Sequence, residues 1–348
     1  MPAAKRKPAP ARKNLSSPSL SIGASIQAYL ASVALARSQH TARAYTNALA
    51  VFQETLRTLG VDPDHDPARQ ASESWIADFA ADLKGYAPAS ERLYLTALTG
   101  WYEYLTAEEI APLNLARVRL LIRQRARKPG QRLPQFPRQA IERVLDYVNT
   151  LASQIVSDQR QHLRNLRDRA FLLTLADTGL RVHEACQLRR GDVDWQEGRA
   201  LLVGKGDREA VVRFSHRSLA ALNDYLHARA PMDGGSGRPM RSLPVFARHD
   251  RGAGRRVLPI TTTTGRTIVH ERVGQALGDA EADKITPHSF RHYFVTVVLR
   301  ASGGNLKLAQ ELARHRNIAV TQRYAHLSDD ELDRGYYEIF DRSDQQTD

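Results

Sequence analysis

Residues 286–324 read TPHSFRHYFVTVVLRASGGNLKLAQELARHRNIAVTQRY, and the rest of the chain is organised around this stretch. Thr286 and Pro287 are typical of a helix start, because a hydroxyl caps the first turn and a proline at the first helical position loses no hydrogen bond. Two glycines at 303–304 end this helix. The stretch therefore predicts three short helices in succession.

Four polar side chains of this stretch point to chemistry on an anion. His288 and Arg291 are three residues apart, so they share one face of the first helical turn. The partial positive charge of the helix N-terminus lies on the same side. His315 follows the second helix and Tyr324 ends the third. We expect these four side chains to surround one basic hollow.

The composition predicts a nucleic-acid partner. The chain has 348 residues, a hydrophobic share of 42% and a net charge of +12, which suits two domains with real cores. The basic excess indicates a polyanion, more often nucleic acid than an acidic membrane surface. No segment approaches the roughly 18 apolar residues of a spanning helix. The single cysteine, Cys186, excludes an internal disulfide and fits a reducing cytoplasm.

The hydrophobic pattern before the opening stretch predicts several parts. Residues 1–19 form a basic arm that is disordered by composition. Residues 20–108 carry four amphipathic helical stripes, which indicate a small helical DNA-binding bundle. A basic, proline-containing linker is expected over 109–137. Residues 138–348 are expected to form a second domain, which ends in an amphipathic helix.

The second domain is predicted to be mostly helical. Extended runs at 199–203 and 209–214 flank a glycine-containing turn, which is the pattern of a β-hairpin. The segment 231–267 gives no clear pattern. The fold class is therefore mainly α (α+β), with a helical bundle followed by a helical domain that contains a small antiparallel sheet.

Several basic residues outside the main stretch are expected to contact DNA phosphates, because cations that lie against DNA release its counterions. They are Arg43, Arg117, Arg119, Arg123, Arg125, Lys128, Arg314 and Arg316.

The cations and the phenol together fit phosphodiester chemistry. Arg181 and Arg291 can hold the two non-bridging oxygens, because guanidinium is planar and always charged. Tyr324 can act as the nucleophile, and its phosphate ester stays reactive because phenol, with a pKa of about 10, is a good leaving group. Lys205, at the tip of the hairpin, can donate a proton. A zinc site at His288 and His292 is disfavoured, because an arginine lies between the two histidines.

The order and spacing of these residues resembles the tyrosine recombinase, or phage integrase, family, of the Xer-like or mobile-element type. The resemblance covers about residues 20–340. The sequence departs from the family pattern at two places. The family often has Leu-Gly before the later histidine, and it usually has leucine before the second arginine. The matching positions are Arg181, Glu184, Lys205, His288, Arg291, His292, His315 and Tyr324, and the departures are Ala313, Arg314 and Phe290.

The resemblance implies a role for each matching residue. Tyr324 would attack a DNA phosphate to give a 3′-phosphotyrosyl link and a free 5′-hydroxyl. The two arginines and His315 would hold the phosphate, and Lys205 would protonate the leaving 5′-oxygen. His288 would assist proton transfer, while Glu184 and His292 would support these groups from behind. No metal or cofactor is implied.

The resemblance also implies that residues 138–348 form the catalytic domain, with a C-terminal helix that docks into a neighbouring protomer. It further implies the partners and the setting. The expected partner is double-stranded DNA with inverted-repeat sites, bound by a homotetramer or by a heterotetramer with a paralogue. Strands would be exchanged through a Holliday junction, for integration, excision or resolution of a mobile element or replicon, in a prokaryotic cytoplasm at the nucleoid. Two alternatives are a type IB topoisomerase-like enzyme that relaxes DNA and a non-catalytic DNA-binding regulator.

Overall fold

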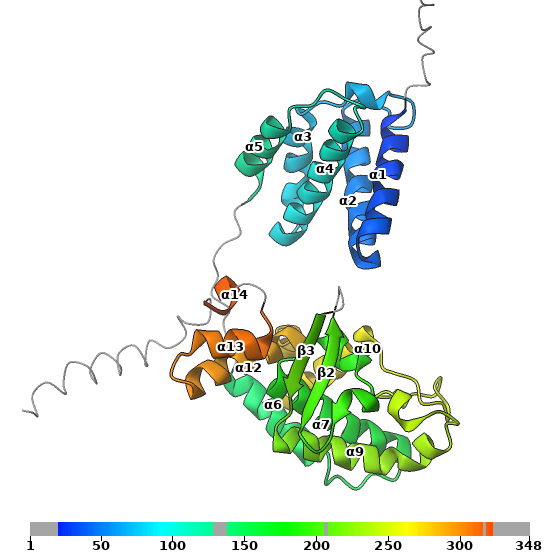
Figure 1. Cartoon of the computed structure of the whole chain (residues 1–348), viewed down its shortest axis with the longest axis vertical. Helices are drawn as coiled ribbons and strands as arrows, with labels where there is room; N and C mark the ends of the chain where they lie inside the picture. The colour runs from blue at the N-terminus through cyan, green and yellow to red at the C-terminus, as the bar shows by residue number, and fades with distance from the viewer. Residues whose placement is uncertain (1–19, 128–137, 205–207, 316–317, 323–348) are drawn as a thin grey trace, which may run out of the picture. The chain divides into compact units, whose positions relative to one another are not determined.

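The computed structural model describes residues 20–127, 138–204, 208–315 and 318–322 (Figure 1). The chain divides into two compact units, Met1–Gln131 and Arg132–Asp348, and each is described by itself. In the described ranges, no helix has the length and apolar character needed to cross a membrane.

Unit 1 is a helical bundle built around aromatic side chains. Its helices are α1 (Ile22–Ala36), α2 (Gln39–Thr58), α3 (Trp75–Asp82), α4 (Pro88–Ala107) and α5 (Leu115–Arg125), with short 3-10 turns at Ala68–Gln70 and Leu83–Gly85. The serines Ser21 and Ser38 cap α1 and α2 through their hydroxyls. Phe52 and Trp101 are fully buried, with ring centroids 5.6 Å apart. The four predicted helical stripes are therefore present as α1 to α4.

Helix α5 differs from the expectation for this region, because it lies in the segment 109–137 that was expected to be a linker. Val118 is fully buried in the core of unit 1, and Leu121 and Ile122 pack against that core. Just after α5, Arg127 forms an ion pair with Glu91, whose side chain is fully buried. The basic residues of α5 obscured its apolar face, so composition alone suggested a linker.

Unit 2 is mainly helical, and α7 runs through its centre. Its helices are α6 (Arg138–Thr150), α7 (Gln159–Thr178), α8 (Val182–Gln187), α9 (His216–Gly234), α10 (Thr262–Leu277), α11 (Asp279–Ala282), α12 (Pro287–Ala301), α13 (Leu306–Ala313) and α14 (Ile318–Gln322), with 3-10 turns at Arg190–Asp192 and Met240–Ser242. Helix α7 contacts α6, α9 and α12, and most of its residues are buried. The apolar side chains of this unit form one large core.

A small antiparallel sheet accompanies these helices. Its strands are β1 (Val193–Asp194), β2 (Arg199–Gly204) and β3 (Arg208–Arg213), in the order β1-β2-β3. Strands β2 and β3 pair with Gly204 opposite Arg208, so they form the predicted hairpin. The two-residue strand β1 was not predicted, since it is too short to show an alternating pattern. The helical bundle and the mostly helical second unit with its small sheet confirm the predicted fold class.

Buried polar contacts hold the segment 231–267, which the sequence left without a prediction. Arg229 is fully buried on α9 and forms an ion pair with Asp233 at 2.9 Å. The same guanidinium donates hydrogen bonds to the carbonyls of Pro244 and Val245, at 2.8 and 2.9 Å. Because these donors satisfy backbone oxygens of the irregular segment, Arg229 fixes its path over α9.

We expect the Arg229→Ala variant to lose about 3–5 kcal/mol of unfolding free energy, because two buried carbonyls lose their donor and the buried Asp233 carboxylate keeps only its ion pair with Arg190. Urea unfolding followed by circular dichroism would measure this. The control is Arg248→Ala, which removes a solvent-accessible ion pair with Asp250 and should cost far less. Equal losses for the two variants would contradict the structural role of Arg229.

Stability should also depend on pH through His249. Its ring accepts or donates a 2.7 Å hydrogen bond with the Tyr225 hydroxyl, and it is buried. Burial, and then the nearby Arg167 and Arg229, lower the pKa of His249 to about 3. The unfolded chain, whose histidine pKa is about 6.5, binds more protons below that pH. The stability that neutral His249 contributes is therefore fully present above about pH 6.5, and it is lost as the pH falls toward 3.

Thermal unfolding between pH 7.5 and pH 4.5 would measure this dependence. We expect His249→Gln to reduce the slope of Tm against pH, because glutamine can keep a hydrogen bond to Tyr225 but does not titrate. An unchanged slope would show that His249 does not contribute to the acid sensitivity.

Candidate active site

Helix α12 positions two of the predicted site residues. Thr286 is the N-cap of α12 and Pro287 is its first residue, as the sequence predicted. The Thr286 backbone N–H donates to the Ser289 hydroxyl at 3.1 Å, which fixes the start of the helix. His288 and Arg291 therefore lie one turn apart, at the N-terminal end of α12.

Arg291 is buried and held by backbone carbonyls of two other helices. Its side chain donates to the carbonyl oxygen of Gly179, at the end of α7, and to that of Ala313, at the end of α13. Gly179 has a φ of 60°, and a Cβ there would lie 2.5 Å from the Phe294 ring. Position 179 therefore needs glycine. The carbonyl oxygen of this glycine accepts the hydrogen bond from Arg291.

The Arg291 guanidinium is a charged group in a partly dry environment. It is 3% exposed. Burial, and then the charges of Arg181 and Arg314, lower the pKa of Arg291 to about 9. It is therefore still protonated at neutral pH. A cation with few water partners interacts strongly with any anion that reaches it.

Arg181 lies opposite α12, at the N-cap of α8. Its backbone N–H donates to Glu184 Oε2 at 2.8 Å, and its Nη1 lies 3.0 Å from Glu184 Oε1. Burial alone would raise the pKa of Glu184, but Arg314 and Arg181 together lower it, so the carboxylate is ionised. The Arg181 side chain remains 45% exposed, so it can still turn toward a ligand.

Three histidines complete the cluster. The rings of His288 and His292 are 4.2 Å apart, in an edge-to-face arrangement. Nδ1 of His315 is 2.9 Å from the hydroxyl of Thr321, which is fully buried in α14. Burial and the neighbouring arginines lower the pKa of His315 to about 4, and burial with His288 and Arg291 lowers the pKa of His292 to about 4. Both rings are therefore neutral near pH 7.

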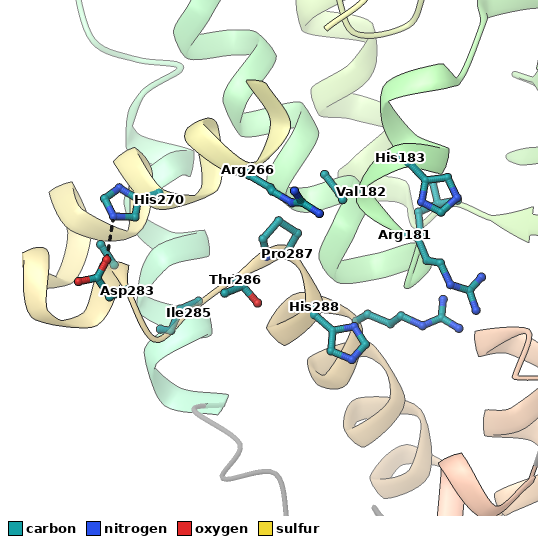
Figure 2. A pocket seen from close by; sticks show the side chains of 13 residues that line it. Arg181, Val182, His183, Arg266, His270, Asp283, Ile285, Thr286, Pro287 and His288 are labelled. Carbon is teal, nitrogen blue, oxygen red and sulfur yellow. Dashed lines mark hydrogen bonds and ion pairs between the residues drawn. The ribbon is translucent and has the colours of Figure 1, made fainter. Parts of the chain in front are cut away.

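A cavity of about 490 Å³ opens between α8, α10 and the start of α12 (Figure 2). Arg181 and His288 point toward the same side of it, while His270 pairs with Asp283 at the other end. Its remaining lining includes Arg266 and His183, and neither these two nor His270 was predicted. The signal was weak, because Arg266 and His270 are an ordinary i, i+4 pair on a helix.

The structure brings together most of the residues predicted for the active site. Arg181, Glu184, His288, Arg291, His292 and His315 lie on α8, α12 and the turn after α13, within a single electrostatically coupled cluster. Tyr324, Lys205, Lys128 and Arg316 lie outside the described residues. In the part of the chain that the structure describes, no group of three His, Cys, Asp or Glu side chains could hold a metal ion.

The predicted DNA contacts divide into two groups. The exposed group consists of Arg43 on α2 and Arg117, Arg119, Arg123 and Arg125 on α5. Arg119 also forms a 2.7 Å ion pair with Glu103. Arg314 differs from the expectation, because its side chain is only 12% exposed and pairs with Glu184 at 3.1 Å. Arg314 is the left-handed C-cap residue of α13, and its side chain reaches Glu184 in α8.

Comparisons with known proteins identify the family of this chain. The phage integrase family matches residues 139–331 of the chain. The chain is 30% identical over 296 residues to the tyrosine recombinase XerC of Bacillus pumilus, covering 85% of this chain and 88% of that protein. It is 28% identical over 302 residues to XerC of Treponema denticola, covering 85% and 91%.

Two solved structures share the fold. XerH bound to a palindromic difH substrate, in a post-cleavage complex, has a TM-score of 0.61 and 18% identity, covering 85% of this chain and 79% of that chain. A lambda integrase dimer bound to a COC′ core site has a TM-score of 0.59 and 15% identity, covering 88% and 95%.

The fold and the arginine–histidine cluster, together with these relatives, define a tyrosine-type enzyme of site-specific DNA recombination. The chain belongs to the phage integrase family.

Proposed function

We propose that this enzyme cleaves duplex DNA by attack of Tyr324 on a phosphate held between Arg181 and Arg291. The supporting observation is the buried, protonated Arg291, which lies beside Arg181 at the mouth of one cavity. Attack forms the bond from the tyrosine oxygen to phosphorus and breaks the bond to the 5′-oxygen. A 3′-phosphotyrosyl link and a 5′-hydroxyl result, and the reverse attack by another 5′-hydroxyl joins the strands.

The arginines stabilise the negative charge that develops on the phosphate. Each guanidinium offers a fork of N–H donors, and a donor that is already fixed needs no reorganisation during the reaction. Arg291 is fixed by the carbonyls of Gly179 and Ala313. Arg181 is more exposed, so it completes the grip when DNA arrives.

His315 adds a neutral hydrogen-bond donor to the same phosphate. Thr321 can donate its hydroxyl proton to His315 Nδ1, which are 2.9 Å apart. This places the imidazole proton on Nε2, the nitrogen that is left to face a ligand. His288, whose pKa is lowered by burial and by Arg291, is suited to move the proton of the attacking phenol.

Lys205 is proposed as the acid that protonates the leaving 5′-oxygen. The described hairpin supports this role only by its register, because Gly204 and Arg208, which flank residues 205–207 in the chain, are paired. Glu184 and His292 would not contact the phosphate. They would instead keep the two arginines and His288 in position.

The proposed substrate is double-stranded DNA with inverted-repeat sites. The structural relatives bound to difH and to a COC′ core site support a DNA partner. Unit 1 would hold the duplex, mainly through the exposed arginines of α5. The basic arm 1–19 and the rest of the segment 109–137 would add further contacts to phosphates. Four copies, of this chain or of this chain and a paralogue, would pair two sites through their C-terminal helices and exchange strands through a Holliday junction, in a prokaryotic cytoplasm at the nucleoid. The product would be an integrated, excised or resolved mobile element or replicon.

A pool of nicked duplexes with randomised sequence tests the proposal. A nick beside the cleaved bond lets the short strand diffuse away, so the covalent protein–DNA adduct accumulates. We expect wild-type protein to enrich duplexes with a repeat pattern in the adduct fraction. Failure to form any adduct, by wild-type protein that binds the pool, would refute the cleavage mechanism.

A further inference from the structure

Arg314 occupies a backbone position that favours glycine. Its φ is 57° and its ψ is 44°, and it is one of two non-glycine residues with positive φ in the described ranges. An L-amino acid side chain disfavours this left-handed conformation. A glycine would therefore end α13 at a lower conformational cost, so the arginine needs a reason in its side chain.

The Arg314 side chain lies inside the cluster. It is 12% exposed, and its Nη2 atom is 3.1 Å from Glu184 Oε2 and 3.4 Å from the Gly179 carbonyl oxygen. Its Nε is buried and has no hydrogen-bond partner among the described residues. The side chain therefore reaches back from the residue before His315 to α8 and to the end of α7.

Glu184 connects Arg314 to Arg181. One carboxylate oxygen, Oε1, pairs with the Arg181 side chain. The other, Oε2, accepts from the Arg181 backbone N–H and pairs with Arg314. Arg314 therefore pairs with the Glu184 carboxylate, which would otherwise have Arg181 as its only cationic partner. An arginine that is fully occupied by a carboxylate is a poor ligand for a phosphate, because both anions use the same fork of donors.

We propose that Arg314 is a positioning residue that holds Glu184 by its Oε2 side, so that Arg181 is released to grip the DNA phosphate. A second contact of Arg314, with the Gly179 carbonyl oxygen, links the residue before His315 to the end of α7. This inference rests on the proposed function, because Arg181 is assigned there as a phosphate ligand. It differs from an assignment of Arg314 as a direct DNA contact.

Arg314→Gly is the informative variant, since glycine suits the left-handed backbone and removes only the side chain. We expect the rate of adduct formation, on the duplex enriched by wild-type protein, to fall about 10- to 100-fold, the range for loss of one charged hydrogen bond. The DNA Kd should stay within about 3-fold of that of Lys307→Ala. This control removes one charge from the same helix, at a site where the lysine is 71% exposed.

Two further variants separate positioning from simple helix capping. Arg314→Lys keeps a cation, so it should recover a large part of the lost rate. Arg314→Gly combined with Glu184→Gln should be no slower than Arg314→Gly alone, because a neutral amide no longer competes for Arg181. Wild-type rates in Arg314→Gly, or strictly multiplicative losses in the double variant, would overturn the proposal.

Thermal unfolding makes the proposal testable without DNA. The Tm changes of Arg314→Gly and Glu184→Gln should be non-additive, because the two side chains contact each other. If wild-type protein forms no adduct, the cleavage mechanism fails, and the non-additivity of the Tm changes then tests the contact between Arg314 and Glu184 by itself. If wild-type protein forms adducts but the Tm changes add, the cleavage mechanism stands and the Arg314 assignment fails.

Discussion

Tyr324→Phe is expected to abolish covalent attachment to DNA, because no adduct can form without the nucleophile, so the adduct signal should fall more than about 10⁴-fold, to the detection limit. Phenylalanine keeps the ring and lacks only the oxygen that would bond to phosphorus. DNA affinity should therefore remain within about 3-fold of wild type, since the cations that bind phosphates are unchanged. Denaturing gels of the nicked-duplex reaction and a binding titration at fixed salt measure the two quantities.

A matched tyrosine controls for loss of a hydroxyl elsewhere in the same unit. The Tyr147 hydroxyl donates to Gln275 at 3.1 Å, on the outer side of α6. Tyr147→Phe should form adducts at nearly the wild-type rate. If Tyr324→Phe still formed adducts, another residue would be the nucleophile; if both variants lost activity equally, the effect would come from folding.

Local sequence signals predicted the parts of the fold that depend on neighbouring residues. The start of α12 follows from a hydroxyl and a proline, and the β2–β3 hairpin from glycines between two extended runs. Helix α5 was missed because arginines are interspersed among the apolar residues that pack on α3 and α4. The path of 231–267 depends on Arg229, a charged residue whose burial becomes favourable only once distant carbonyls meet it.

The same distinction applies to the site. Spacing along the chain predicted that Arg181, His288, Arg291 and His315 lie near one another, because each is at or near a helix end or turn that the sequence marks, and the structure brings them together. The contacts between these residues could not be read from spacing. The hydrogen bond between Thr321 and His315 depends on how α14 packs. Likewise, spacing did not predict that Arg314, which was expected to contact DNA, pairs with Glu184.

Arg291→Lys is expected to lower adduct formation by about 10²- to 10³-fold, the loss typical of removing one fixed donor to a developing oxyanion. Lysine keeps the positive charge, but its single nitrogen cannot hold the carbonyls of Gly179 and Ala313 while it also donates to a phosphate. The phosphate would therefore meet a cation that is no longer fixed in place. Single-turnover cleavage of the nicked duplex, at saturating protein, measures the chemical step apart from binding.

Arg300→Lys is the appropriate control, because Arg300 lies in the last turn of the same helix and is exposed. It should cleave at a rate close to wild type. The stability of Arg291→Lys should be measured alongside, since two buried carbonyls lose part of their hydrogen bonding. A variant that stays folded at the assay temperature and still cleaves at the wild-type rate would show that charge alone is sufficient at this position. The fixed guanidinium fork would then not be the source of catalysis.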